Sequence, residues 1–274
     1  MQMGRWVLLI PVLSIGLAVW ISNRNENEAQ ADFSQAVELW RGGLYLQAIQ
    51  SFSTVQKAYP RSQLADDALW EIANIRYVNF YDVTGAIDSF ESLLRDYPKS
   101  PLTAATHMKL AEILDKDMGE LPEAVDHWQQ ALECDLSGSV REQVEFAVAD
   151  ALFRSNQVDE SFENFSRLEA SAQDEELARK ARLRIGTILQ IRKENQQAID
   201  IFREIVHDGA CGECRLQAQL GLIESYELLD ELPNAIAIAK AIDPLQYSPE
   251  LKEALVNRLL EKQKYYEPKM WDGQ

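Results

Sequence analysis

The chain has 274 residues, of which 46 % are hydrophobic and 26 % charged, and its formal net charge at pH 7 is −17. Residues that favour helices predominate, whereas Gly and Pro number only 12 and 9, so the composition is that of a helical globular protein. The excess of acids argues against a nucleic-acid-binding protein, because no cationic patch is available to replace the counterions of phosphates.

The first predicted element is an uncharged apolar run, Trp6–Ile21, which follows a short stretch carrying Arg5. As a helix at 1.5 Å per residue it spans about 24 Å, slightly less than a hydrocarbon core of about 30 Å. It is interpreted as a membrane anchor, a signal-peptide core or, third, a core helix. The sequence Ala29-Gln30-Ala31 fits a cleavage site, but the three charges within Asn23–Glu28 before it are unusual for a cleaved signal. We therefore favour an N-in anchor and a short linker over residues 1–31.

An internal repeat follows the apolar run. A small–apolar–x–x–bulky pattern recurs six times at intervals of 37 or 38 residues, beginning at Ala48, Ala86, Ala124, Ser161, Ala198 and Ala235. A second series runs in step upstream of it, at Ala36, Ala73, Ala111, Ala149, Gly186 and Ile223. Each unit is predicted to be two helices joined by a turn. One such pair cannot bury its apolar face alone, so the units must stack.

These residues resemble the tetratricopeptide repeat, a helical pair with a small residue in each helix and a Pro at its end. The matching stretches are Gly43-Leu44-Tyr45-x-x-Ala48-x-x-x-Phe52 with Pro60, Gly85-Ala86-x-x-x-Phe90 with Pro98, and Gly119-x-Leu121-x-x-Ala124-x-x-x-Trp128 without a Pro. Later units are more degenerate, and the period exceeds the usual 34 residues. The resemblance implies an all-α, right-handed α-solenoid of about six hairpins over residues 32–246. A capping helix and tail over residues 247–274 would follow it.

Two repeats end in Tyr-Pro-basic-Ser, at residues 59–62 and 97–100. This ending is similar to the bacterial cell-envelope branch of the family, which includes the outer-membrane barrel-assembly lipoprotein and the Tol–Pal coordinator protein. No Cys for lipid attachment follows the apolar run, so a member tethered to the inner membrane is the nearer match. The resemblance implies a single-pass protein of the bacterial inner membrane with its repeats in the periplasm. The alternative is a periplasmic protein cleaved at Ala31.

In this family the first helix of each pair lines a concave surface, so the resemblance implies that partner proteins or peptides bind there. The residues expected on this surface are Phe33, Trp40, Trp70, Asn74, Tyr77, Met108, Glu112, Asp115, Phe146, Asp150 and Phe153. Aromatic side chains dominate interface energetics, and acids attract basic segments. The competing interpretation is that the aromatic residues are core between repeats. Residues 110–136, with eight acids and one base, are either a solvated face or a docking patch for a basic partner.

The three cysteines leave several interpretations open. Cys211 and Cys214 are separated by two residues between the fifth and sixth units. We favour a local disulfide, with free thiols, a redox pair, or a metal site that includes His207 as alternatives. Cys134 has no evident partner in the sequence.

No catalytic motif of the P-loop, GxSxG or HExxH type occurs, and the histidines show no metal-ligand spacing. We therefore expect no enzymatic activity, no cofactor and no metal. The expected function is a protein–protein interaction scaffold or adaptor of the bacterial cell envelope. A redox- or metal-linked protein using Cys211 and Cys214 is one alternative, and a passive spacer or self-associating array is another. The sequence predicts neither the partner nor the oligomeric state.

Overall fold

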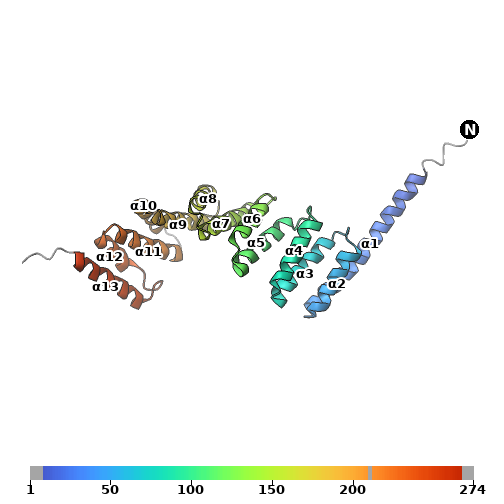
Figure 1. The fold of residues 1–274 in the computed structure, drawn as a ribbon, viewed down its shortest axis with the longest axis horizontal. Helices are drawn as coiled ribbons and strands as arrows, with labels where there is room; N and C mark the ends of the chain where they lie inside the picture. Colours follow the sequence, from blue (N-terminus) through green and yellow to red (C-terminus); the bar gives the residue numbers. More distant parts are fainter. Residues whose placement is uncertain (1–8, 209–211, 267–274) are drawn as a thin grey trace, which may run out of the picture. The chain divides into compact units, whose positions relative to one another are not determined.

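The computed structural model describes residues 9–208 and 212–266, and all regular structure in this part is helical (Figure 1). The chain divides into two compact units at the bond between Asp135 and Leu136. The first unit contains α1 (Leu9–Arg41), α2 (Tyr45–Ala58), α3 (Ala65–Phe80), α4 (Val83–Asp96), α5 (Thr103–Ile113), the π-helical turn η1 (Leu114–Met118) and α6 (Leu121–Leu132). The second contains α7 (Gly138–Arg154), α8 (Val158–Ser171), α9 (Glu175–Ile191), α10 (Asn195–His207), α11 (Gly212–Leu228), α12 (Leu232–Ala241) and α13 (Pro249–Tyr266).

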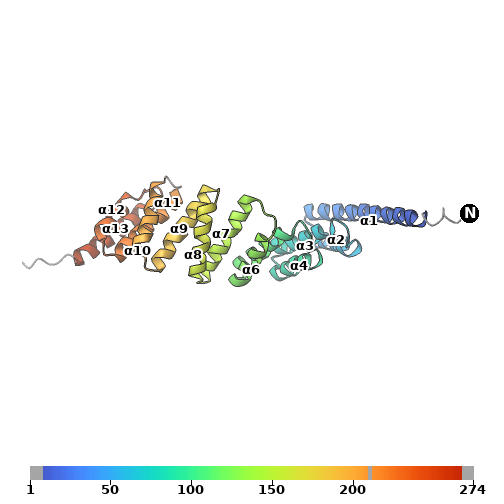
Figure 2. The ribbon, with the colours of Figure 1, turned by 90° about the horizontal axis from the view of Figure 1, so that it is seen from above.

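The helices pair as the repeat pattern predicts. In the first unit α1 and α2, α3 and α4, and α5 and α6 form successive hairpins, and each hairpin contacts the next (Figure 2). The second unit has the hairpins α7–α8, α9–α10 and α11–α12. Helix α13 packs against α12 and buries Leu259 completely, as expected of a helix that covers the exposed end of an array.

The two series of small residues lie in the core. Every member of both series is buried, which allows the two helices of a hairpin to approach closely. The bulky residue one turn further along the second helix fills the space between neighbouring helices, and it is no more than 5 % exposed at Phe52, Phe90, Trp128, Phe165 and Phe202. Burying one such ring contributes about 2 kcal/mol. The spacing of 37 to 38 residues is therefore the spacing of core positions.

Helix α1 runs without a break from Leu9 to Arg41, so the described part of the stretch expected to hold an anchor and a short linker is helical. Ala29 and Ala36 are seven residues apart, two turns on one helix face, and both are fully buried in the first hairpin. The Glu26 carboxylate accepts hydrogen bonds from the Ser62 hydroxyl (3.0 Å) and the Gln63 amide (3.3 Å). Packing against the first hairpin therefore begins at about residue 26, before the residue 32 at which the array is predicted to start.

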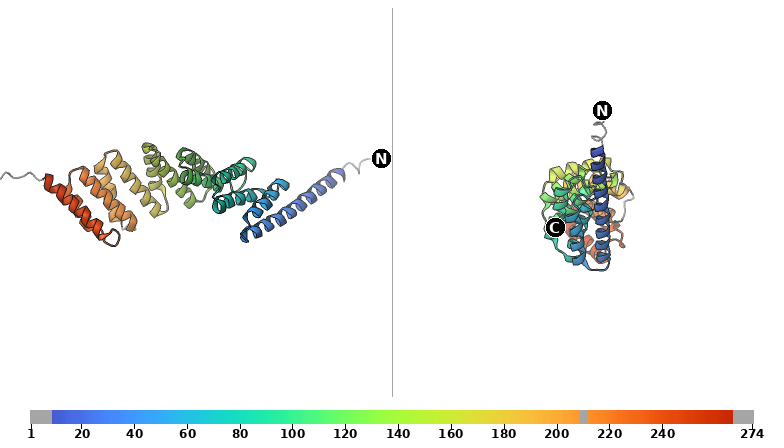
Figure 3. Two further views of the ribbon diagram at one scale, coloured as in Figure 1. Left: turned by 60° about the horizontal axis from the view of Figure 1, so that its bottom comes forward. Right: turned by 90° about the vertical axis from the view of Figure 1, so that its right-hand side faces the viewer.

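The apolar run Trp6–Ile21 falls partly outside the described residues, which begin at Leu9. From Leu9 onward the run belongs to α1, which extends past the end of α2 (Figure 3). In the part of the chain that the structure describes, no helix is both long enough and apolar enough to cross a membrane.

The Tyr-Pro-basic-Ser endings connect one repeat to the next. Each Ser hydroxyl donates to a carboxylate on the first helix of its own repeat, from Ser62 to Glu26 (3.0 Å) and from Ser100 to Asp66 (2.5 Å). Each also accepts a hydrogen bond from the amide two residues further on, at 3.1 and 3.0 Å. In the second unit Glu142 accepts from the two amides that precede α9, at 2.9 and 3.3 Å. An acid of the first helix thus holds the turn that begins the next repeat.

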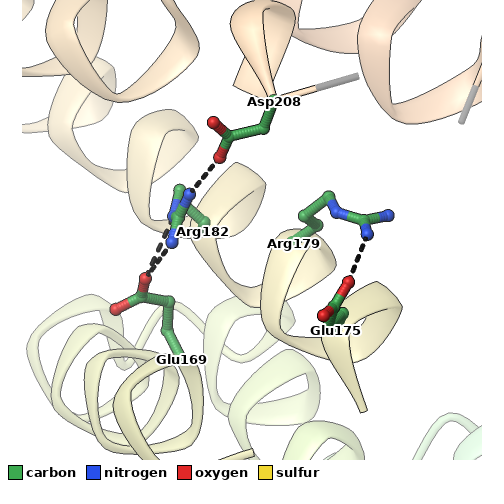
Figure 4. Close-up of polar contacts among 5 residues, drawn as sticks. All are labelled: Glu169, Glu175, Arg179, Arg182 and Asp208. Carbon is green, nitrogen blue, oxygen red and sulfur yellow. Dashed lines mark hydrogen bonds and ion pairs between the residues drawn. The ribbon is translucent and has the colours of Figure 1, made fainter. Parts of the chain in front are cut away.

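A different contact joins the fourth and fifth repeats (Figure 4). Arg182 of α9 donates to Glu169 of α8 at 2.7 Å and to Asp208 after α10 at 3.0 Å. The Arg182 and Glu169 side chains are only about one-quarter exposed, with relative areas of 24 % and 27 %. One guanidinium therefore ties three helices together.

Candidate functional site

A surface pocket of about 350 Å³ lies where α1, α2 and α3 meet. Its lining combines aromatic, aliphatic and polar side chains: Trp40 and Arg41 from α1, Tyr45 from α2, and Glu71, Asn74, Ile75, Val78 and Asn79 from α3. We call it the α1–α3 pocket. Trp40 and Val78 are 42 % and 59 % exposed, so apolar surface is open to solvent at this pocket. Apolar walls with a few polar groups are the usual composition of a binding pocket.

The turn between α1 and α2 places two aromatic residues at this pocket. Gly43 has a φ of +74°, which residues with a side chain rarely adopt, and its amide donates to the Trp40 carbonyl at 2.9 Å. Helix α1 therefore ends just after Trp40, and α2 begins at Tyr45. The Tyr45 ring packs edge-on against Phe80, the last residue of α3, with the ring centroids 6.2 Å apart.

The polar side chains of the pocket differ in whether they have hydrogen-bond or ion-pair partners. The Asn74 side-chain amide donates to the Trp70 carbonyl at 3.0 Å, and the Arg41 guanidinium pairs with Glu38 at 3.1 Å. Glu71 is half-buried, and among the described residues no side chain forms an ion pair or hydrogen bond with its carboxylate. Burial, and secondarily the charge of Asp67, raises the pKa of Glu71.

A second hollow, of about 620 Å³, lies beside the two Tyr-Pro-basic-Ser endings and is lined by residues from 61–67 and 96–101. Its most buried acid, Asp66, is 7 % exposed and already accepts a hydrogen bond from Ser100. Because these residues hold successive repeats together, we interpret this hollow as a seam and the α1–α3 pocket as the functional site.

Three of the aromatic residues expected on the partner surface are partly buried and pack against the core. Each lies three residues before a small position and packs edge-on against the buried Phe of its own hairpin: Phe33 on Phe52 (5.1 Å between centroids), Trp70 on Phe90 (5.3 Å) and Phe146 on Phe165 (5.3 Å). This position faces the second helix of the pair, but the three rings remain partly exposed, so their place on a partner surface stays a prediction.

The aromatic residues four positions after a small residue face the next repeat instead. The Tyr77 hydroxyl donates to Asp117 of η1 at 2.7 Å, and this hydrogen bond, with burial, raises the pKa of Tyr77. Phe153 lies under the Arg184 guanidinium, whose central carbon is 5.9 Å from the ring centroid. At the corresponding place after Ala36, Trp40 lines the open α1–α3 pocket.

The remaining predicted residues do not line this pocket. Asp150 forms ion pairs with Arg154 (3.0 Å) and Arg184 (2.8 Å), so its charge is compensated within the second unit. In the third repeat Glu112 pairs with Lys109 at 3.0 Å, Met108 is half-buried on α5, and Asp115 lies on η1. Of the eleven predicted residues, Trp40 and Asn74 line the α1–α3 pocket. The docking role of the acidic third repeat stays a prediction.

The structure also brings together two histidines that sequence reasoning kept apart. His107 of α5 and His127 of α6 approach with their Nδ1 atoms 3.0 Å apart. Burial, followed by the neighbouring His127, lowers the pKa of His107, and burial lowers the pKa of His127 against the opposing effect of Glu91 and Asp126. The two histidines are 20 residues apart in the sequence, and this spacing does not indicate a contact. They meet because α5 and α6 form a hairpin.

The predicted disulfide cannot be located, because Cys211 lies outside the described residues. Cys214 is 4 % exposed near the start of α11. Within the described residues no three His, Cys, Asp or Glu side chains are grouped so that they could hold a metal ion.

Comparison with known proteins identifies the repeats. Residues 33–101 match the family described as Tetratricopeptide repeat. No curated protein matches the sequence. Similar solved structures include a tetratricopeptide repeat protein from Parabacteroides merdae, with a TM-score of 0.55 and 13 % identity over 85 % of this chain and 99 % of that one.

Two further solved structures share the fold. YrrB, a TPR protein with an unusual peptide-binding site, has a TM-score of 0.55 and 13 % identity over 78 % of this chain and 97 % of its own. PilW, a widely conserved type IV pilus biogenesis factor, has a TM-score of 0.50 and 18 % identity over 83 % of this chain and 98 % of its own. Such identities establish a common fold alone. The matched sequence covers the repeats with the fullest motifs, and proteins of this kind generally mediate protein–protein interactions. By sequence, residues 33–101 match the tetratricopeptide repeat, and the hairpins that follow share the fold of solved tetratricopeptide-repeat proteins.

Proposed function

We propose that this protein is a non-enzymatic scaffold that binds partner proteins or peptides through the α1–α3 pocket, as an adaptor of the bacterial cell envelope. The observation that carries the proposal is one pocket that combines the exposed Trp40, Tyr45 and a Glu71 carboxylate with no partner among the described side chains. Trp and Tyr dominate the binding energy of interfaces, and a polar group among them gives specificity.

The size of the pocket favours a peptide segment over a folded domain. A hollow of about 350 Å³ lies at the small end of the range for ligand pockets, so it accommodates one or two side chains. Such side chains would project from an extended segment, with Asn74 and Asn79 beside its backbone. YrrB is described as having an unusual peptide-binding site, which is consistent with peptide binding by this fold.

The proposal includes an N-terminal tether that holds the repeats on the periplasmic side of the inner membrane. Its support is the sequence, in which no charge interrupts Trp6–Ile21. Cleavage after Ala31 would remove Glu26 and Ala29, which pack in the first hairpin, and this favours retention of the segment. Membrane fractionation with mass measurement of the extracted chain tests the point. A mature chain that begins at Asp32 would replace the tether with the periplasmic alternative.

The binding site is tested by crosslinking in intact cells, comparing wild type with Trp40→Ala. Leu245→Ala is the matched control, because Leu245 is 93 % exposed and lies in the other unit. We expect specific partners to be lost with Trp40→Ala and kept with Leu245→Ala, at unchanged melting temperatures. If both variants capture the same partners as wild type, the α1–α3 pocket is not the binding site.

The same crosslinking assay distinguishes the scaffold from a redox- or metal-linked protein. A scaffold keeps its partners when Cys211 and Cys214 are both replaced by Ser, whereas a protein that works through this pair loses its activity or its partners. For a passive spacer, Trp40→Ala should also leave the set of crosslinked proteins unchanged.

A further inference from the structure

Glu71 carries the charge in the α1–α3 pocket that the described side chains neutralise least. Its carboxylate is half-buried in a pocket that Ile75 and Trp40 also line, and no described side chain forms an ion pair or hydrogen bond with it. Partial burial disfavours a charged carboxylate, and Asp67 one turn earlier adds repulsion; both raise the pKa of Glu71. A cation placed in the pocket would relieve both penalties.

The other walls of the pocket suit the rest of a long cationic side chain. Trp40 and Tyr45 present aromatic rings, which attract cations by their quadrupoles and pack well on methylene stems. Arg41 also lines the pocket, but its guanidinium pairs with Glu38 at 3.1 Å and not with Glu71. The cationic position opposite Glu71 is therefore not filled by the described part of the chain.

We propose that the α1–α3 pocket is a recognition site for a Lys or Arg side chain of the bound peptide, with Glu71 as its counter-ion. The inference rests on the proposed function and adds the chemical class of the partner. The aromatic rings of Trp40 and Tyr45 flank the side chain, and the amide oxygen of Asn74 accepts from the peptide backbone. Charge complementarity supports this occupant, because the protein carries a net charge of −17 and the partner segment would be basic.

The test is selection of a random nine-residue peptide display library on the full chain, purified in mild detergent. The variants are Glu71→Gln and Trp40→Ala, and the matched control is Glu163→Gln, which removes an exposed charge on α8. Wild type and Glu163→Gln should enrich peptides with Lys or Arg at one fixed position. Glu71→Gln should still bind peptides but lose the preference for a cation, and Trp40→Ala should lose binding.

The two proposals fail in different ways. If wild type enriches an apolar or acidic residue at the fixed position, the cation site is refuted while peptide binding stands. If no peptide is enriched, or if Trp40→Ala behaves as wild type, the proposed function itself fails. Self-association through the pocket would appear as a change of oligomeric state with Trp40→Ala, and it would also overturn the peptide site.

A double-mutant cycle then measures the pair directly. The best peptide and its variant with norleucine for Lys, or Gln for Arg, are titrated against wild type and Glu71→Gln. A charge-assisted hydrogen bond at a half-buried site predicts a loss of about tenfold or more in affinity with wild type. With Glu71→Gln the same change in the peptide should cost less than about twofold, since the counter-ion is already gone. Equal losses with both proteins would refute the pairing, and circular dichroism melts confirm that each variant is folded.

Discussion

Gly186 of α9 lies so close to the ring of Phe202 that a Cβ added to the glycine would stand 2.5 Å from the ring's Cε1 atom. Gly221 of α11 stands at the Cε2 edge of the same ring, and its added Cβ would be 2.6 Å away. One ring of α10 is thus held between glycines of the two neighbouring first helices. The fifth repeat has Gly where the earlier repeats have Ala because Phe202 leaves no room for a methyl group.

Gly186→Ala should therefore destabilise the protein, although Ala favours helices over Gly. Overpacking a core costs about 1–3 kcal/mol, and the gain of about 1 kcal/mol in helix propensity offsets only part of it. We expect a lower urea midpoint with an unchanged slope. Gly138→Ala is the control, because an added Cβ there meets nothing within 4 Å. Equal stability of Gly186→Ala and wild type would contradict the close contact.

Ser100→Ala should lower the free energy of unfolding by about 1–2 kcal/mol. The variant loses the bond to Asp66 and the cap on the Leu102 amide, and it leaves a carboxylate that is 7 % exposed without its donor. Chemical denaturation measures the change. Ser139→Ala, at an exposed position near the start of α7, should be neutral. A loss no larger than that of the control would show that the Tyr-Pro-basic-Ser ending has another role.

Arg182→Met should cost about 1 kcal/mol, because it removes the bridge from α9 to Glu169 and Asp208 while keeping an apolar stem. Arg179→Met offers a matched comparison one turn earlier on the same helix (Figure 4). Arg179 pairs within α9 with Glu175, whose side chain is 89 % exposed, so its replacement should change stability little. Similar denaturation midpoints for the two variants would argue against a bridge between repeats.

The histidine pair should make stability depend on pH. Burial lowers the folded-state pKa of both His107 and His127, so protonation favours the unfolded chain. The pair's contribution is fully present above about 6.5, the usual unfolded value, and is lost as the pH falls through the lower folded values. Urea unfolding at pH 7.5 and 5.5 should show a smaller loss of stability for His107→Gln/His127→Gln than for wild type. His207→Gln, at an exposed position, should keep the wild-type dependence.

Periodicity was sufficient to predict the hairpins, because Ala48, Phe52 and their equivalents are core positions that recur with each repeat. Two positions of one helix face can nevertheless differ by the neighbour that each meets: Phe33 and Trp70 pack edge-on against a ring of their own hairpin and stay partly exposed. The −3 position meets its own hairpin and the +4 position meets the next repeat. The sequence alone does not distinguish these neighbours.

The pocket was only partly predictable for a related reason. Trp40 and Asn74 follow from the pattern, whereas Glu71 and Tyr45 reach the pocket through contacts between helices. A Glu on a helix of an acidic protein is expected to face solvent, and its lack of a partner depends on the surrounding fold. Residues 24–31 belong to α1, and the burial of Ala29 depends on the packing of α1 against α2, which the cleavage-like pattern Ala29-Gln30-Ala31 does not reveal.

The unbroken course of α1 has a mechanical consequence. Because residues 9–25 and the first hairpin share one continuous helix, residues 9–25 cannot rotate about the helix axis independently of that hairpin. Inserting one residue between Ile21 and Glu26 would turn everything before it by about 100° and advance it by 1.5 Å, whereas inserting seven would nearly restore the phase. A contact that fixes the rotation of the N-terminal half of α1 about its axis therefore also fixes the direction in which the α1–α3 pocket faces.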